Sequence, residues 1–169
     1  KMVIMFKRFV RHFVASYWHV QRYFPTRTCA RITRAIGRAE SRHTAQMRFV
    51  VEASLTPHQL LHRVSARERA LEVFSSLRIW DTAANNGVLI YVLLGDHAVE
   101  IIADRGVASQ VNQAQTWVPI LLQLQQAFAA GQYEAGTLGA IDAVAAELSR
   151  HFPSDGAHPD KLPNTITLL

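Results

Sequence analysis

The first 25 residues carry apolar side chains at the spacing of one helical face. These side chains recur every three or four positions, while the basic residues gather on the opposite side. Pro25 ends the pattern, because proline disfavours a helical conformation in the residue before it. We therefore predict an amphipathic helix over residues 6–24, with its apolar face formed by Phe6, Phe9, Val10, Phe13, Val14, Tyr17, Val20 and Phe24.

Helical and strand patterns alternate through residues 26–153. Apolar positions at helical spacing predict a helix over about 26–43, a second over about 65–80 and two more between 117 and 152. Runs rich in β-branched and apolar residues predict strands, and the run at 88–94 is apolar throughout, which is typical of a strand covered on both faces. The three predicted strands are 47–55, 88–94 and 97–103.

The connections between these segments predict how the strands pair. A helix separates strand 47–55 from strand 88–94, so we expect these two strands to be parallel. Gly95-Asp96 fits a two-residue hairpin, which places strand 97–103 antiparallel to 88–94. The last residues are polar and rich in proline, and we expect a flexible tail. The predicted organisation is an N-terminal helix over 1–25, an α/β domain over 26–153 and a tail over 154–169.

The charge is distributed unevenly along the chain. Residues 1–50 hold eleven lysines and arginines and one acid, whereas residues 51–169 hold seven bases and twelve acids. Such an imbalance indicates either an anionic partner, such as a membrane surface, or attraction between the two parts of the chain. Because the aromatic side chains lie among the apolar positions and not among the arginines, nucleic acid is an improbable partner. The candidate anion-binding residues are Lys7, Arg8, Arg11, Arg22, Arg31, Arg34 and Arg38.

No stretch approaches the roughly 20 apolar residues that a membrane-spanning helix needs. The first apolar run is interrupted by Lys7 and Arg8, so no signal-peptide core is visible. We expect a cytoplasmic protein, peripheral at the membrane if the basic helix binds lipid. Because the sequence begins with Lys1 and not with methionine, a secreted or periplasmic location stays open.

Polar side chains cluster where the predicted hairpin strands begin and end. Asp81, Asn85 and Asn86 precede strand 88–94, and Asp104 follows strand 97–103. An antiparallel pair would bring both loops to one end of the hairpin, where carboxylate and amide oxygens suit a hard cation such as Ca²⁺. The alternative interpretation is turn chemistry, in which these side chains only bond to nearby backbone groups.

The segment Asn85-Asn86-Gly87-Val88-Leu89-Ile90-Tyr91-Val92, followed by a hairpin into Asp104-Arg105-Gly106, resembles the centre of the TPM domain. The later stretch from Trp117 to Gly136 is similar to the helical ending of that domain, and the likeness covers roughly residues 32–152. This family is also called the TPM phosphatase family, after an acid phosphatase of the thylakoid lumen. The resemblance implies a three-layer α/β/α fold with a small mixed sheet, and a divalent cation in a cleft at one end.

Motifs of the common catalytic classes are absent from the sequence. It contains no GxSxG, GxGxxG, GxxxxGK[ST] or HExxH pattern, so we expect neither a nucleotide nor a haem cofactor. Any phosphatase chemistry would need a metal, with Arg105 as the candidate that offsets developing charge.

Three functions therefore stay open. The first is a binding or scaffold domain of the TPM type, stabilised by a divalent cation. The second is a metal-assisted acid phosphatase that hydrolyses phosphomonoesters. The third is a peripheral membrane adaptor that acts through the basic N-terminal helix. Because the basic segment faces an acidic remainder, we predict that the phenylalanine face of helix 6–24 packs on the domain and not into lipid.

Overall fold

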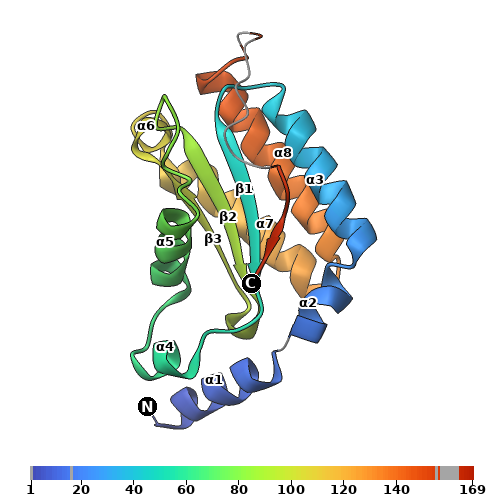
Figure 1. Ribbon diagram of the computed structural model, residues 1–169, viewed down its shortest axis with the longest axis vertical. Helices are drawn as coiled ribbons and strands as arrows, with labels where there is room; N and C mark the ends of the chain where they lie inside the picture. The colour runs from blue at the N-terminus through green and yellow to red at the C-terminus, as the bar shows by residue number, and fades with distance from the viewer. Residues whose placement is uncertain (1, 16, 155, 157–163) are drawn as a thin grey trace.

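A four-stranded mixed sheet forms the centre of the computed structural model, which describes residues 2–15, 17–154, 156 and 164–169 (Figure 1). The strand order is β3-β2-β1-β4, with β1 parallel to β2 and β2 antiparallel to β3. Phe49 pairs with Ile90 in the first ladder, which confirms the predicted parallel pairing. The strands are β1 (Gln46–Glu52), β2 (Gly87–Leu93), β3 (Ala98–Ala103) and β4 (Thr167–Leu168).

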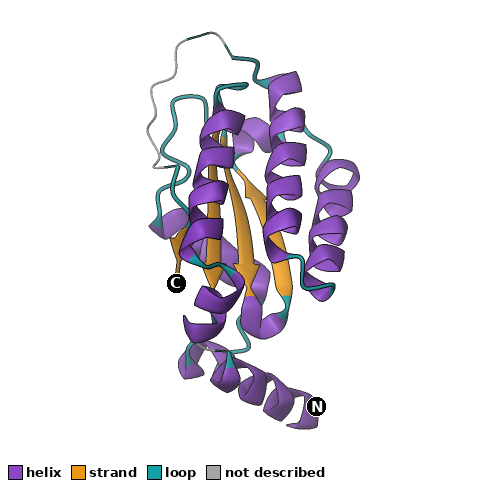
Figure 2. Cartoon of the chain, turned by 90° about the vertical axis from the view of Figure 1, so that its right-hand side faces the viewer, coloured by secondary structure: helices purple, strands orange, loops and turns teal. Residues whose placement is uncertain are grey.

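Helices cover both faces of this sheet, so the fold is a three-layer α/β/α arrangement (Figure 1), and Figure 2 looks onto the helices of one face with the strands behind them. One face packs against α3 (Thr26–Glu40), α7 (Gln113–Ala129) and α8 (Tyr133–His151). The other face packs against α5 (Ala66–Ser76), and the short α4 (Pro57–Leu61) contributes Leu60 to the same core. Every residue of β1 and β2 is buried, as the continuous apolar run in β2 predicted.

Two predictions about connections and termini differ from the structure. The connection between β2 and β3 is not a two-residue hairpin but a 3₁₀ turn, η1 (Leu94–Asp96), completed by His97 at φ 52°. The C-terminal segment is not a tail throughout, because Leu169 donates a backbone hydrogen bond to Val51 and β4 pairs in parallel with β1. Residues 155 and 157–163 of the predicted tail lie outside the described residues.

The predicted helix over 6–24 is divided into α1 (Met2–Val14) and α2 (Tyr17–Tyr23). The two pieces contribute to different cores: Phe9 of α1 packs on the α5 side of the sheet, whereas Val20 and the following Phe24 pack on the α3 side. A single straight helix would not reach both cores, and this explains the break. No described helix has both the length and the apolar character to span a membrane.

Asp96, in the turn between β2 and β3, holds α1 against the domain. The guanidinium group of Arg8 donates to both carboxylate oxygens, with Nη2 2.7 Å from Oδ2, and also to the carbonyl of Val64. The backbone N–H of Leu55 donates to Nδ1 of His12 at 2.9 Å, so the ring proton is on Nε2, which donates to Asp96 Oδ1 at 2.9 Å. Burial raises the pKa of Asp96, but the hydrogen bonds from His12 and Arg8 outweigh it and hold this pKa well below its usual range.

Arg8 and His12 of α1 therefore face the domain, and much of the apolar side of this helix faces water. The side chain of His12 is only 1% exposed, whereas Phe6 is 69% exposed and Phe13 is 92% exposed. The prediction that the phenylalanine face packs on the domain is thus wrong for most of α1 and holds only for Phe9, which is partly buried. The reason is that Arg8 and His12 find a carboxylate and backbone partners on the domain.

We expect Asp96→Asn to lower the free energy of unfolding by about 2 kcal/mol at neutral pH, because asparagine keeps the shape but loses the charge that binds Arg8 and His12. Since the pKa of Asp96 is depressed on folding, its stabilisation is present above the unfolded pKa of about 4 and is lost as pH falls toward the folded value. In urea titrations, the difference in stability between wild type and variant should therefore begin to shrink as the pH falls below about 4.

Asp142→Asn is the matched control, because Asp142 pairs with Arg42 on the surface and its side chain is 76% exposed. Its stability should stay within about 0.5 kcal/mol of the wild type. Equal effects of the two substitutions would contradict the anchoring role of Asp96.

Candidate functional site

The loop before β2 and the loop after β3 lie against each other, as the hairpin predicted. The backbone N–H of Asp104 donates to the carbonyl of Gly87 at 2.9 Å, and that of Gly106 donates to the carbonyl of Asn85 at 2.9 Å. These bonds continue the β2–β3 ladder beyond its last pair, Val88 with Ala103. Two loops that carry oxygen-bearing side chains are thereby fixed at the end of the sheet beside α6 (Arg105–Ala108) (Figure 1).

Two glycines permit close backbone contacts at this end of the sheet. A Cβ atom on Gly87 would lie 1.9 Å from the carbonyl oxygen of Ile79, and one on Gly106 would lie 2.5 Å from the carbonyl oxygens of Ala84 and Asn85. Both distances are far below a van der Waals contact, so no other residue fits without movement of the backbone. Gly106 therefore reflects the packing of the two loops on each other, whereas Gly87 reflects the packing of the start of β2 on the turn after α5 that carries Ile79.

Asp104 contributes the most distinctive group of this site. Its Oδ1 atom accepts a hydrogen bond from the backbone N–H of Arg105 at 2.7 Å and so caps the start of α6. Its Oδ2 atom is buried and accepts no hydrogen bond from the described residues. A buried carboxylate oxygen without a donor is energetically costly unless a cation compensates it. Asp104 therefore fits the role of a cation ligand.

The other three predicted ligands are arranged less favourably. Asn85 Oδ1 accepts from Arg105 Nη2 at 3.2 Å, and Asn86 Nδ2 donates to the carbonyl of Thr44 at 3.2 Å. Asp81 is exposed, and no hydrogen bond or ion pair of the described residues joins it to Asp104. No group of three histidine, cysteine, aspartate or glutamate side chains with metal-binding geometry occurs in the described part of the chain. A cation at these loops would need amide or backbone oxygens besides Asp104.

Arg105, the candidate for charge stabilisation, lies at the same loop pair. Its guanidinium group is exposed and bonds to Asn85, so it brings positive charge beside Asp104. This charge disfavours a bound cation and favours an anionic ligand, so the two predicted roles compete locally. Neither Asp104 nor Arg105 hydrogen-bonds to a serine, cysteine or histidine side chain among the described residues. The arrangement therefore provides binding groups without an evident nucleophile or general acid.

A buried ionic cluster that the sequence pattern did not predict joins β1, β2 and α5. Arg69 donates forked hydrogen bonds to Glu52, with Nε and Nη2 each 2.9 Å from a carboxylate oxygen. The hydroxyl group of Tyr91 donates to Glu52 Oε2. Burial, as the larger cause, and this hydrogen bond together raise the pKa of Tyr91 well above its usual range. The three side chains provide one another with hydrogen-bond partners, which indicates that the cluster is structural. Only the strand register, in which Glu52 lies opposite Leu93, brings Tyr91 near.

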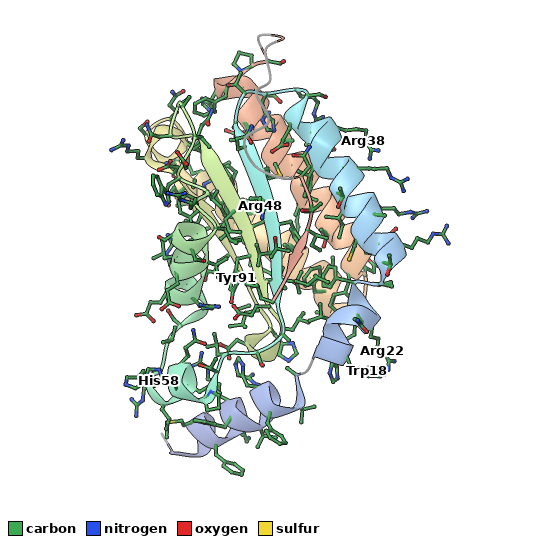
Figure 3. All side chains as sticks on the ribbon, in the orientation of Figure 1. Trp18, Arg22, Arg38, Arg48, His58 and Tyr91 are labelled. Carbon is green, nitrogen blue, oxygen red and sulfur yellow. The ribbon has the colours of Figure 1, made fainter. Side chains whose placement is uncertain are left out.

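The predicted anion-binding residues occupy different environments (Figure 3). Arg8 points inward to Asp96, and Arg31 bonds to Glu134, so both are engaged within the domain. The guanidinium group of Arg22 lies 5.4 Å from the ring centroid of Trp18, at the end of the molecule where α1 lies. The predicted residues with exposed side chains are Lys7, Arg11, Arg22, Arg31, Arg34 and Arg38.

Comparisons with known proteins agree with this architecture. The NMR structure of the BA42 protein from the psychrophilic bacterium Bizionia argentinensis superposes with a TM-score of 0.75 and is 28% identical, covering 85% of this chain and 93% of that chain. A search of curated proteins gave no match. The TPM domain family matches residues 21–147, which is most of the chain and includes both loops of the candidate site. The chain therefore belongs to the TPM domain family.

Proposed function

We propose that this protein is a binding or scaffold domain whose two loops around Asp104 hold a divalent cation, with Ca²⁺ as the principal candidate. The observation that carries the proposal is the buried Oδ2 atom of Asp104, which has no hydrogen-bond donor among the described residues. The absence of a nucleophile or general acid bonded to Asp104 or Arg105 in the described part of the chain supports binding over catalysis.

The candidate ligands are a small number of hard oxygen donors, which suits weak calcium binding. Asp104 and Asp81 would provide carboxylate oxygens, and Asn85 or Asn86 would provide amide oxygens. The guanidinium group of Arg105 would have to release Asn85 for that residue to participate. We therefore expect a dissociation constant on the order of 10⁻⁴ M or weaker. A cation bound there would tie the loop before β2 to the loop after β3 and stabilise the folded state.

Calcium should raise the melting temperature of the wild-type protein. At a concentration ten times the dissociation constant, binding to the folded state contributes about 1.4 kcal/mol. Differential scanning calorimetry with and without millimolar calcium measures this rise. Asp104→Asn should remove most of it, because asparagine lacks the negative charge, and Asp81→Asn should reduce it.

Asp142→Asn removes one carboxylate from α8, outside both loops, and should leave the calcium response intact. Melting curves that do not move with millimolar calcium, magnesium or manganese would exclude the site.

A metal-assisted acid phosphatase is the alternative, and the phosphatase name of the family is its main support. A bound cation would polarise a phosphoryl oxygen. In this alternative Asp104 would hold the cation, and Arg105 would bind the phosphoryl group once it releases Asn85. No described side chain bonded to these two residues would supply an attacking group or a proton.

We expect no hydrolysis of p-nitrophenyl phosphate above the buffer rate at acidic or neutral pH, with calcium, magnesium or manganese present. The binding-domain proposal requires this result, because the loops provide no nucleophile and no general acid. The measurement is release of p-nitrophenol by the purified wild-type protein. Turnover that Arg105→Ala and Asp104→Asn each abolish, while Asp142→Asn preserves it, would establish the phosphatase instead.

A peripheral membrane adaptor is the third candidate function. It concerns the end of the molecule that carries α1, opposite the loops around Asp104. Its supporting observation is the exposure of Phe6, Phe13 and Trp18, three large apolar side chains on α1 and α2. Adaptor and cation-binding roles are compatible, because α1 lies at one end of the sheet and α6 lies at the other (Figure 1).

A further inference from the structure

The orientation of α1 is the reverse of that expected for an amphipathic helix on a domain surface. Such a helix normally packs its apolar side on the core and leaves its charges in water. In this protein the side chain of Arg8 is 20% exposed and that of His12 is 1% exposed, because both bond to Asp96. Arg8 and His12 on the polar side of α1 are bonded to the domain, and apart from Phe9 its described apolar side chains are largely exposed.

The exposed apolar side chains form a set at helical spacing. Phe6, Val10, Phe13 and Val14 follow one another at intervals of four, three and one along α1, and their exposed fractions are 69%, 46%, 92% and 57%. Trp18 continues the series on α2 and is 60% exposed. Large apolar patches on an isolated domain typically mark an interaction site. Beside them a groove of about 310 Å³ runs between α1, α2 and the turn that carries Gly95 and His97.

The charged residues of the N-terminal segment that carries this surface are all basic. No aspartate or glutamate occurs before Glu40, whereas Lys7, Arg11 and Arg22 lie among or beside the apolar positions. The side chain of Arg11 is 49% exposed although it lies 3.6 Å from Asp96, and the guanidinium group of Arg22 lies over Trp18. Tryptophan flanked by bases is typical of side chains at a membrane–water interface, where each base near an anionic surface contributes about 1 kcal/mol.

We propose that α1 and the start of α2 dock on an anionic phospholipid surface, with the exposed phenylalanines inserted below the headgroups. This inference rests on the adaptor function proposed above and names its partner. A second copy of the chain is disfavoured as the occupant, because an isologous contact would bring the same bases face to face. The helix would lie in the interface, since α1 comprises 13 residues and no described helix is able to span a bilayer.

This docking fixes the orientation of the domain on the membrane. In both views α1, at the N-terminus, lies crosswise at one end of the sheet (Figures 1 and 2), and Figure 1 shows α6, which Asp104 caps, at the far end. The cation-binding loops would therefore point away from the bilayer and stay accessible from water. Lipid binding and cation binding would be separate events at opposite ends of one rigid sheet.

Co-sedimentation with vesicles tests the proposal. The wild-type protein should sediment with vesicles of phosphatidylcholine and phosphatidylglycerol at low salt, and at least tenfold less with pure phosphatidylcholine. The double variant Phe6→Ser, Phe13→Ser should lose at least tenfold in binding to the anionic vesicles. The double variant Lys7→Glu, Arg22→Glu should lose as much, and high salt should weaken wild-type binding.

The matched control is Val118→Ser, Leu122→Ser on α7, where both side chains are about as exposed as Val10 but have no bases of α1 beside them. This variant should bind like the wild type. All variants should melt close to the wild type, because the substituted side chains are exposed; circular dichroism verifies this.

Three outcomes would overturn the proposal. One is failure of the wild-type protein to bind anionic vesicles at low salt. Another is equal loss of binding in the α1 and α7 variants. The third is concentration-dependent dimerisation in sedimentation velocity that Phe6→Ser, Phe13→Ser abolishes, because it would make a second copy the occupant. None of these outcomes bears on the cation site, which the calcium melting experiment tests without lipid.

Discussion

The carboxylate of Asp96 determines how the N-terminal helices sit on the domain. It lies in the turn that the β2–β3 pairing places at one end of the sheet, and it binds Arg8 and His12 from α1. His12 in turn accepts the N–H of Leu55, so the same contact also fixes the segment after β1. Because Phe6 and Phe13 lie on the opposite side of α1 from Arg8 and His12, they face outward once these polar groups are bonded to the domain. The exposed apolar surface is thus a consequence of an ionic contact.

The sheet separates two regions with different chemistry. At the α6 end, Gly106 allows two loops to touch, and Asp104 contributes a buried oxygen that lacks a donor among the described residues. At the other end, exposed aromatic side chains share a surface with the bases of α1 and α2, and Asp96 beside them is already bonded. Between the ends, the bonded cluster of Glu52, Arg69 and Tyr91 ties β1 and β2 to α5. The match to the TPM domain family, over residues 21–147, includes the loops of the first region.

Local sequence signals predicted the parts of the fold that depend on local physics. Apolar positions at helical spacing indicated α5, whose start Ser65 and Glu68 cap in the structure, and the apolar run of β2 indicated its burial on both faces. The break between α1 and α2 escaped prediction, because it depends on Phe9 and Val20 packing on opposite sides of the sheet. The two-residue β4 is too short to show a pattern. The meeting of the two site loops followed from the hairpin, but the bond between Arg105 and Asn85 required the side-chain geometry.

Solvent paramagnetic relaxation measures directly whether the phenylalanines of α1 face outward, on the wild-type protein and without lipid. A soluble gadolinium chelate should strongly broaden the side-chain NMR signals of Phe6 and Phe13, which are 69% and 92% exposed. The signals of Val20 and Phe24, which are 0% and 1% exposed, should stay sharp. If Phe6 and Phe13 were protected as well as Phe24, α1 would pack through its apolar side, and Asp96 would not be the group that orients it.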